Sequence, residues 1–306
     1  MKNLLFLRGK VDKRTETTLD INKHTDMWTQ VAREFTNHGY KVTILYWGGT
    51  WFHKYTDNLR EVWVPNLKDY NNKPDLIFAR GGFPEYDYLV HKYITAKQIY
   101  YGAGVRTVPH KNHHYDLVIV DDLGDVSRVK GKHPKSTVWP WFKPAADNVF
   151  KPLKMAKTYN VCFPANGTQP FKGFKYVYSS CPKDLSILNL GYPQKKVKIP
   201  DNVYSIRVPR QEMPEWYNKC RVGIVCTSDY DSHPRVISEM LACGLPVVAL
   251  DRVRFRDNHW AVKRPKDSFW QTVRGACQYN LTKKVYDYYI KRYSVKIQVK
   301  KLLELL

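Results

Sequence analysis

The sequence predicts an α/β protein made of two successive halves, each a parallel β-sheet covered by helices on both faces. Short, uninterrupted apolar runs of strand length alternate with segments in which apolar residues recur at helical spacing. Strands of a parallel sheet are buried on both faces, so they read as continuous apolar runs. A length of 306 residues fits two domains, or one large domain.

The first half opens with a strand over 2–7, which ends in a turn at Arg8-Gly9 and a polar loop to about residue 22. Helical spacing follows at Met27, Trp28, Val31, Ala32 and Phe35, and Gly39 marks the end of that helix. Further strands are expected over 41–47, 61–64, 74–79, 98–101 and 115–120.

A Pro-rich, aromatic stretch over 138–158 predicts the connection between the halves. In the second half, strands are expected over 159–163, 195–199, 203–207, 222–226 and 246–250, and helices over 214–219 and 235–243. We therefore expect Rossmann-like domains over 1–150 and 151–284, facing each other across a ligand-binding cleft. Residues 285–306 form a basic amphipathic tract, expected to be a C-terminal helix that folds back on the first domain.

The composition points to a polyanionic partner. The chain carries 50 Lys and Arg against 28 Asp and Glu, a net charge of +22. Residues 1–150 account for +6 of this charge and residues 151–306 for +16. Apolar content excludes wholesale disorder, no run reaches the length of a membrane span, and the start lacks a signal-peptide core. We expect a soluble, cytoplasmic protein. A Lys-rich, solvated surface without a polyanionic partner is the alternative explanation of the charge.

The segment 227–251 carries the most information about chemistry. A buried strand runs into a polar loop, and a helix begins at Arg235 and ends at Gly244. The free N–H groups at the start of such a helix form a ready site for an anion. Glu239 lies about one turn inside the helix, and a carboxylate can accept hydrogen bonds from two sugar hydroxyls. The alternatives are a helix cap for Asp231 and a solvated position for Glu239.

This segment resembles the donor-binding signature of the retaining GT-B glycosyltransferases of glycosyltransferase family 4. In that signature an acidic residue, seven residues and a glutamate are followed by Gly-x-Pro-Val-Val; here these are Asp231, 232–238, Glu239 and 244–248. The resemblance implies a GT-B fold, a nucleotide diphosphate sugar as donor, most simply a UDP-sugar, and a retaining transfer. It also implies that Glu239 binds the ribose hydroxyls. The family usually has Glu at the first acidic position, so Asp231 departs from its pattern.

The same resemblance assigns the loop before the helix to the donor sugar and its diphosphate. Asp231, His233 and Arg235 are then the candidates beside the reacting sugar, and the backbone of Ser232 and Pro234 lines the donor.

Weaker matches lie elsewhere in the chain. Lys172-Gly173 resembles the family's Lys-Gly element, whose lysine binds the donor phosphates. The family's Gly-Arg pair is missing, and Ala165-Asn166-Gly167 stands in its place. Residues 147–152 resemble the family's interdomain stretch. Arg80 stands where a strand commonly ends near a functional histidine; it either clamps a phosphate or sugar, or forms a surface salt bridge.

The resemblance implies no metal requirement and no permanently bound cofactor. Asp229-Tyr230-Asp231 spells the metal-binding triplet of the other large glycosyltransferase fold, which keeps a metal role open as an alternative. An inverting enzyme would need a general base in the first half. Its candidates, none of which is assigned, are Asp20, His24, Asp26, Asp121 and Asp122.

Three hypotheses for the acceptor are compatible with the sequence. The charge favours a hydroxymethylated base in duplex DNA, as in phage DNA modification, with the base flipped into the site. The second reading is a lipid-linked or cell-envelope precursor, with 285–306 docking on an anionic membrane. The third is a non-catalytic, basic nucleic-acid-binding protein whose donor site has decayed. The sequence predicts no oligomeric state.

Overall fold

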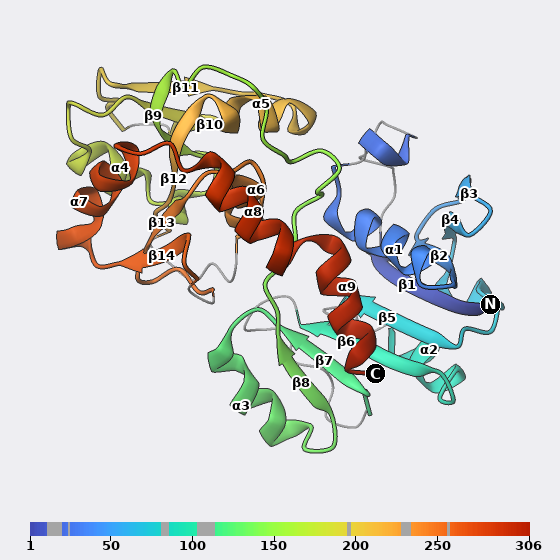
Figure 1. Cartoon of the computed structure of the whole chain (residues 1–306). Coiled ribbons are helices and arrows are strands. Elements are labelled where there is room, and N and C mark those ends of the chain that lie inside the picture. Colours follow the sequence, from blue (N-terminus) through green and yellow to red (C-terminus); the bar gives the residue numbers. More distant parts are fainter. Residues whose placement is uncertain are drawn as a thin grey trace. The chain divides into compact units, whose positions relative to one another are not determined.

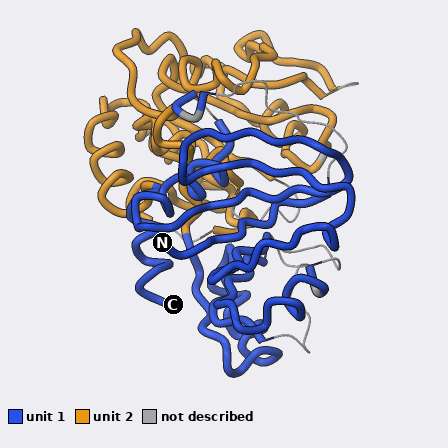
Figure 2. Tube along the Cα trace, turned by 90° about the vertical axis from the view of Figure 1, so that its right-hand side faces the viewer, with its two compact units in different colours: residues 1–141, 295–306 blue, residues 142–294 orange. Residues whose placement is uncertain are grey.

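The computed structural model describes residues 1–10, 20–23, 25–80, 86–102, 114–194, 197–227, 234–255 and 258–306. The chain forms two compact units (Figures 1 and 2): unit 1 is Met1–Trp141 with Val295–Leu306, and unit 2 is Phe142–Ser294. The sequence predicts boundaries at 150 and 284. They lie at 141 and 294 because Phe142, Phe150, Val285 and Tyr289 are buried in one apolar cluster of unit 2.

Unit 1 contains an eight-stranded sheet in the order β3-β4-β2-β1-β5-β6-β7-β8. Neighbouring strands are parallel except β3, which is antiparallel to β4. The strands are β1 (Lys2–Lys10), β2 (Tyr40–Trp47), β3 (Trp51–Thr56), β4 (Leu59–Val64), β5 (Leu76–Arg80), β6 (Lys97–Gly102), β7 (Leu117–Val120) and β8 (Thr137–Pro140). The sequence predicts neither β3 nor β8. Both are edge strands with half-exposed residues, so neither forms a continuous apolar run.

Helices cover both faces of this sheet. On one face, α1 (Met27–Asn37) and α9 (Val295–Glu304) bury Trp28, Phe35 and Val299 against β1, β2 and β5. On the other face, α2 (Tyr86–Lys92) and α3 (Leu123–Lys132) contribute Leu89 and Val129 to a second cluster. The last helix of the chain therefore completes the core of unit 1 (Figure 1).

Val299→Asp is expected to destabilise unit 1 strongly. Val299 is fully buried on α9 among Trp28, Phe35 and Leu302, and an unpaired carboxylate there costs about 3–5 kcal/mol. Lys301→Asp, at an exposed position of the same helix, should change the free energy of unfolding by no more than about 1 kcal/mol. Urea unfolding followed by tryptophan fluorescence measures both. Equal losses would show that α9 does not belong to the core of unit 1.

Unit 2 contains a six-stranded, fully parallel sheet in the order β11-β10-β9-β12-β13-β14. Its strands are β9 (Tyr159–Phe163), β10 (Ile187–Leu190), β11 (Val203–Ile206), β12 (Cys220–Val225), β13 (Val247–Leu250) and β14 (Ala261–Arg264). Counted from β9, this is the 3-2-1-4-5-6 order of the doubly wound nucleotide-binding fold.

One strand prediction in unit 2 was wrong. Residues 197–199, the described part of the strand expected over 195–199, lie outside the sheet and lead to Pro200. The place between β9 and β11 belongs to β10, a buried run of only four residues. The polar residue Asn189 interrupts the apolar run of β10, so the sequence does not predict this strand.

Helices α4 (Phe174–Ser180) and α7 (Lys266–Cys277) cover one face of the second sheet. The other face carries α5 (Met213–Asn218), α6 (Arg235–Ala242) and α8 (Thr282–Tyr293). The tract 285–306, expected as one helix, is interrupted at Ser294, so that α8 packs in unit 2 and α9 in unit 1. Among the described residues, no helix has the length and apolar character needed to cross a bilayer.

Candidate functional site

The candidate site lies where the strand order of unit 2 reverses, between β9 and β12. Ligands of doubly wound sheets bind at this switch point, outside the carboxyl ends of the strands. The 3-10 turn η3 (Pro170–Lys172) follows β9, and α6 follows β12. The structure therefore brings Lys172, Gly173 and the start of α6 to the same edge of one sheet, as the sequence analysis requires of a donor site.

Gly173 fixes the position of Lys172 through a close backbone contact. Its φ angle is +84°, and a Cβ atom at this position would lie 1.7 Å from the carbonyl oxygen of Cys226, just past the end of β12. Only glycine permits both this left-handed conformation and this approach. Lys172, the preceding residue, is half-buried, and its Nζ lies 5.0 Å from the Phe171 ring centroid. The backbone next to Lys172 is thus held beside the end of β12, the strand that leads to α6.

Glu239 is buried on α6, with only 2% of its surface exposed, so the alternative of a solvated helix residue is wrong. Arg210, from the turn η4 (Arg210–Glu212), forms an ion pair and a hydrogen bond with Oε1. The hydroxyl of Tyr217 on α5 donates to Oε2 at 3.3 Å. Burial, together with the charge of Glu239, raises the pKa of Tyr217 well above its ordinary value, so this hydroxyl keeps its proton at neutral pH.

This arrangement leaves hydrogen-bonding capacity on both oxygens of Glu239. An ionised carboxylate offers about four lone-pair sites. Arg210 and Tyr217 each use one, on different oxygens. A pair of neighbouring hydroxyls, such as a ribose presents, could donate to the remaining sites. The Arg210 guanidinium also lies 5.6 Å from the Phe150 ring, so a residue of the interdomain stretch braces the cluster.

Sequence reasoning did not identify Arg210 or Tyr217. They lie 29 and 22 positions before Glu239, and no local pattern joins them to it. Only a physical argument predicts that such partners exist, because a glutamate inside a buried helix requires a cationic or hydrogen-bonding partner.

The start of α6 is only partly described. Pro234 is buried at its N-cap position, and Arg235 is exposed. Inside the helix, the Ser238 hydroxyl donates to the carbonyl of Lys143, which fastens the interdomain stretch to α6. The predicted donor residues Asp231, Ser232 and His233 lie outside the described residues, as does the triplet 229–231.

The loop over 165–167, which stands where family 4 has a Gly-Arg pair, is held by contacts with β10 and the residue after it. The Asn189 side chain donates to the carbonyls of Phe163 and Ala165 at 3.0 and 2.9 Å. A Cβ on Gly191 would lie 2.2 Å from the Ala165 carbonyl oxygen. The Asn166 carboxamide accepts from the Thr168 backbone N–H at 3.2 Å, so it serves the local turn.

In unit 1, Arg80 is the last residue of β5, at the switch point of the first sheet. The neighbouring strand β1 carries Arg8, whose side chain is 10% exposed and pairs with Asp26 at 3.1 Å. Asp26 also caps α1, and Asp122 caps α3. Both acids therefore have structural partners, and His24 lies outside the described residues.

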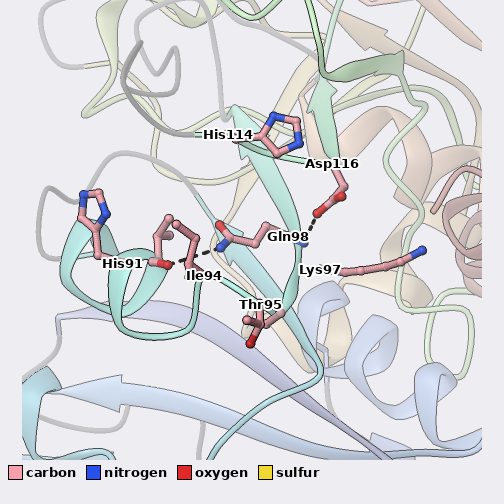
Figure 3. Close-up of a pocket in the computed structure, with 9 residues that line it drawn as sticks. His91, Ile94, Thr95, Lys97, Gln98, His114 and Asp116 are labelled. Carbon is pink, nitrogen blue, oxygen red and sulfur yellow. Dashed lines mark hydrogen bonds between the residues drawn. The ribbon is translucent and has the colours of Figure 1, made fainter.

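A separate cavity of about 290 Å³ lies at the opposite edge of the first sheet, before β6 and β7 (Figure 3). It is lined by His91, Lys97, Gln98, His114 and Asp116, among others. Asp116 accepts from the Gln98 backbone N–H at 2.7 Å. Across the described part of the chain, no three His, Cys, Asp or Glu side chains gather as a metal ion would need. None of the predicted site residues lines this cavity.

The similarity to known proteins lies in the fold and not in the sequence. No protein-family model and no curated protein matches the sequence. Sucrose-phosphate synthase (tll1590) from Thermosynechococcus elongatus has a similar structure, with a TM-score of 0.68 and 10% identity over 99% of this chain and 98% of that one. Anabaena Alr3699/HepE in complex with UDP and glucose has a TM-score of 0.66 and 12% identity over 100% of both chains.

A third neighbour is an alpha-glucosyltransferase in complex with UDP and a 13-mer DNA containing an HMU base. Its TM-score is 0.67 at 12% identity, over 99% of both chains. These neighbours are GT-B glycosyltransferases. With one sheet that is parallel except for β3 and a second that is fully parallel, the chain has the GT-B fold of two Rossmann-like domains, as the sequence predicts.

Proposed function

We propose that the protein is a glycosyltransferase that moves a sugar from a UDP-sugar to an acceptor hydroxyl. The observation that carries this proposal is the buried Glu239, which Arg210 and Tyr217 hold at the switch point with acceptor sites left for two hydroxyls. Two structural neighbours, HepE and the alpha-glucosyltransferase, are in complex with UDP. A buried carboxylate that binds ribose and a lysine near the diphosphate would fit such a donor.

The proposed reaction forms a bond between the acceptor oxygen and sugar C1 and breaks the bond between C1 and the diphosphate oxygen. UDP leaves with the electron pair, and the acceptor hydroxyl gives its proton to the departing diphosphate oxygen. Stabilising the charge on the departing diphosphate is the main catalytic task. We assign it to Lys172 and to the loop that ends at Pro234 and Arg235, without a metal ion. Retention of configuration is part of the proposal, by resemblance to family 4.

For the acceptor we propose a hydroxyl on a modified base of duplex DNA, reached in the cytoplasm of a bacterial host. The net charge of +22 and the DNA complex of one structural neighbour support this choice. The lipid-linked alternative relied on an amphipathic tract at 285–306. Apolar residues of this tract are buried in the cores of the two units: Val285 and Tyr289 in unit 2, and Val299 and Leu302 in unit 1. They form no free apolar face for a membrane.

The proposed function is tested by incubating the protein with UDP-glucose and other UDP-sugars, together with DNA that contains hydroxymethylated or unmodified pyrimidines. Nucleoside mass spectrometry after digestion should detect a glycosylated nucleoside only from the hydroxymethylated DNA. Slow hydrolysis of a UDP-sugar without transfer to DNA would keep the donor assignment and overturn the acceptor. If no UDP-sugar binds, the proposed enzyme activity is wrong.

Lys172→Ala is expected to lower kcat/KM for the donor by about 10- to 100-fold, the value of one charged hydrogen bond of about 1.5–3 kcal/mol. The matched control is Lys175→Ala, an exposed position on α4 three residues further on. Initial rates at varied UDP-sugar concentration measure the effect. An unchanged donor kcat/KM in the Lys172 variant would remove this lysine from the proposed diphosphate site.

A further inference from the structure

Two adjoining cavities form a groove in unit 2. One, of about 570 Å³, lies between residues 151–154 and the start of α8. The other, of about 190 Å³, lies between Lys157, Arg221 and residues 279–282. Both cavities are lined by Asn280 and Thr282, so they adjoin along this loop. We name the combined surface the basic groove.

The basic groove carries five cations and one acid. Its cations are Lys151, Lys154, Lys157, Arg221 and Lys283. The acid, Asp287, is paired with Lys283 at 2.7 Å. Within the described ranges, the other four cations have no carboxylate within ion-pair distance. The nearby Asp147 accepts a hydrogen bond from the Tyr289 hydroxyl at 2.7 Å, and its charge reaches the groove at Tyr286.

Two of these cations, Lys157 and Arg221, line the smaller cavity together and lie close enough to interact electrostatically. Burial is the main cause that lowers the pKa of Lys157; Cys220 and Cys243 oppose this shift, and the positive charge of Arg221 adds to it. Two like charges held together in a half-buried position repel each other unless an anion lies between them. The excess positive charge of the groove therefore favours the binding of a negatively charged ligand.

The groove is remote from the candidate donor site. Lys157 lies two residues before β9, and Arg221 is the second residue of β12, whereas Lys172 follows the carboxyl end of β9. The five residues of β9 span about 17 Å at about 3.3 Å per residue. The two sites thus lie at opposite edges of one sheet, within one compact unit.

We propose that the basic groove binds the phosphodiester backbone of DNA, as a second contact apart from the donor site. This proposal rests on the DNA acceptor of the proposed function. Lysine, arginine, asparagine, threonine and tyrosine are among the residue types that contact DNA phosphates, and the groove offers all five. Tyr279, 63% exposed, stands at its rim.

A phosphodiester chain fits this surface better than a membrane does. The cations line a concave surface, and three of them, Lys151, Lys154 and Lys157, follow one another along the chain, which suits a ligand with repeated charges. Phosphate contacts fix the position of DNA but carry no sequence information. The groove therefore strengthens acceptor binding without selecting the base. Each strand carries one phosphate per about 3.4 Å of helix axis, so about five base pairs span the distance along β9.

The test compares two triple variants with the same change in net charge. The groove variant is Lys151→Gln/Lys154→Gln/Lys283→Gln, at three exposed positions. The control is Lys183→Gln/Lys198→Gln/Lys266→Gln, also exposed in unit 2 but outside the groove. Affinity for a fluorescent, unmodified 30-base-pair duplex is measured over a salt series. The groove variant should bind about tenfold or more weakly, and its log–log salt slope should fall by about two to three, at about 0.9 per phosphate contact.

The control should keep most of the wild-type slope, and both variants should keep the wild-type melting temperature and UDP affinity. A second groove variant, Arg221→Gln, should lower the slope by about one. Equal DNA binding by the groove and control variants would overturn the groove and leave the glycosyltransferase untouched. No DNA binding by the wild type would overturn both the groove and the DNA acceptor, while UDP-sugar turnover tests the enzyme separately. Groove-dependent binding to phosphatidylserine vesicles but not to DNA would also overturn the proposal.

Discussion

Glu239→Ala is expected to abolish measurable UDP binding and sugar transfer. In the proposed complex, the carboxylate accepts two hydroxyls of the ribose, and each charged hydrogen bond contributes about 1.5–3 kcal/mol. Losing both would weaken UDP binding by about 100- to 10,000-fold. The substitution also leaves the Arg210 guanidinium and the Tyr217 hydroxyl without their acceptor. Isothermal titration with UDP measures the first effect, and rates with a UDP-sugar the second.

Two variants separate donor binding from folding. Glu239→Gln keeps the shape of the side chain but loses one acceptor oxygen and the charge, so it should retain part of the affinity. Glu215→Ala, at an exposed position of α5, should leave UDP binding unchanged. The melting temperature of each variant shows whether unit 2 still folds. A folded Glu239→Ala protein with wild-type UDP affinity would remove Glu239 from the donor site.

Gly173→Ala is expected to disrupt unit 2 and donor binding together. The left-handed conformation costs an alanine about 1–2 kcal/mol. The new methyl group would also lie 1.7 Å from the Cys226 carbonyl oxygen, a distance that requires the backbone to shift. We expect a loss of more than about 3 kcal/mol in unfolding free energy, beyond the ordinary cost of a point mutation. Because Lys172 is the adjacent residue, the donor KM should rise as well.

Gly39 supplies a matched control for this change. Its φ angle is +81°, nearly that of Gly173, but a Cβ built there meets no atom within 4 Å. Gly39→Ala therefore carries only the conformational cost, about 1–2 kcal/mol. The difference between the two variants in urea unfolding isolates the contact with Cys226. Equal losses would contradict the close approach of the two chain segments.

The sequence predicts those parts of the fold whose burial shows as a continuous run of apolar residues. The central strands β1, β2 and β5 and the strands β9, β12 and β13 are short apolar runs with turns after them, and they were all anticipated. The edge strand β3 alternates between half-buried and exposed residues, and β10 is interrupted by Asn189. Such elements acquire their structure from the neighbouring strands rather than from their own composition. The interruption at Ser294 likewise depends on which unit each helix contacts.

The candidate site was predictable to the extent that its residues share a local pattern. Glu239 and Lys172 stand in short motifs, and the topology brings both motifs to one sheet edge. Arg210 and Tyr217 meet Glu239 only through tertiary structure, so no spacing in the sequence could select them. The close approach of Gly173 to Cys226 joins residues 53 positions apart, and the sequence alone gives no measure of it.

The assignment of α9 to unit 1 has a consequence for the order in which the protein folds on the ribosome. Domains commonly fold in the order of their synthesis. Here the residues of α9 that cover Trp28 and Phe35 are made after the whole of unit 2. Unit 2 can therefore reach its final structure while one apolar face of unit 1 is still uncovered. The first half of the chain is the last to be completed, and during that interval it is the half open to chaperones and to aggregation.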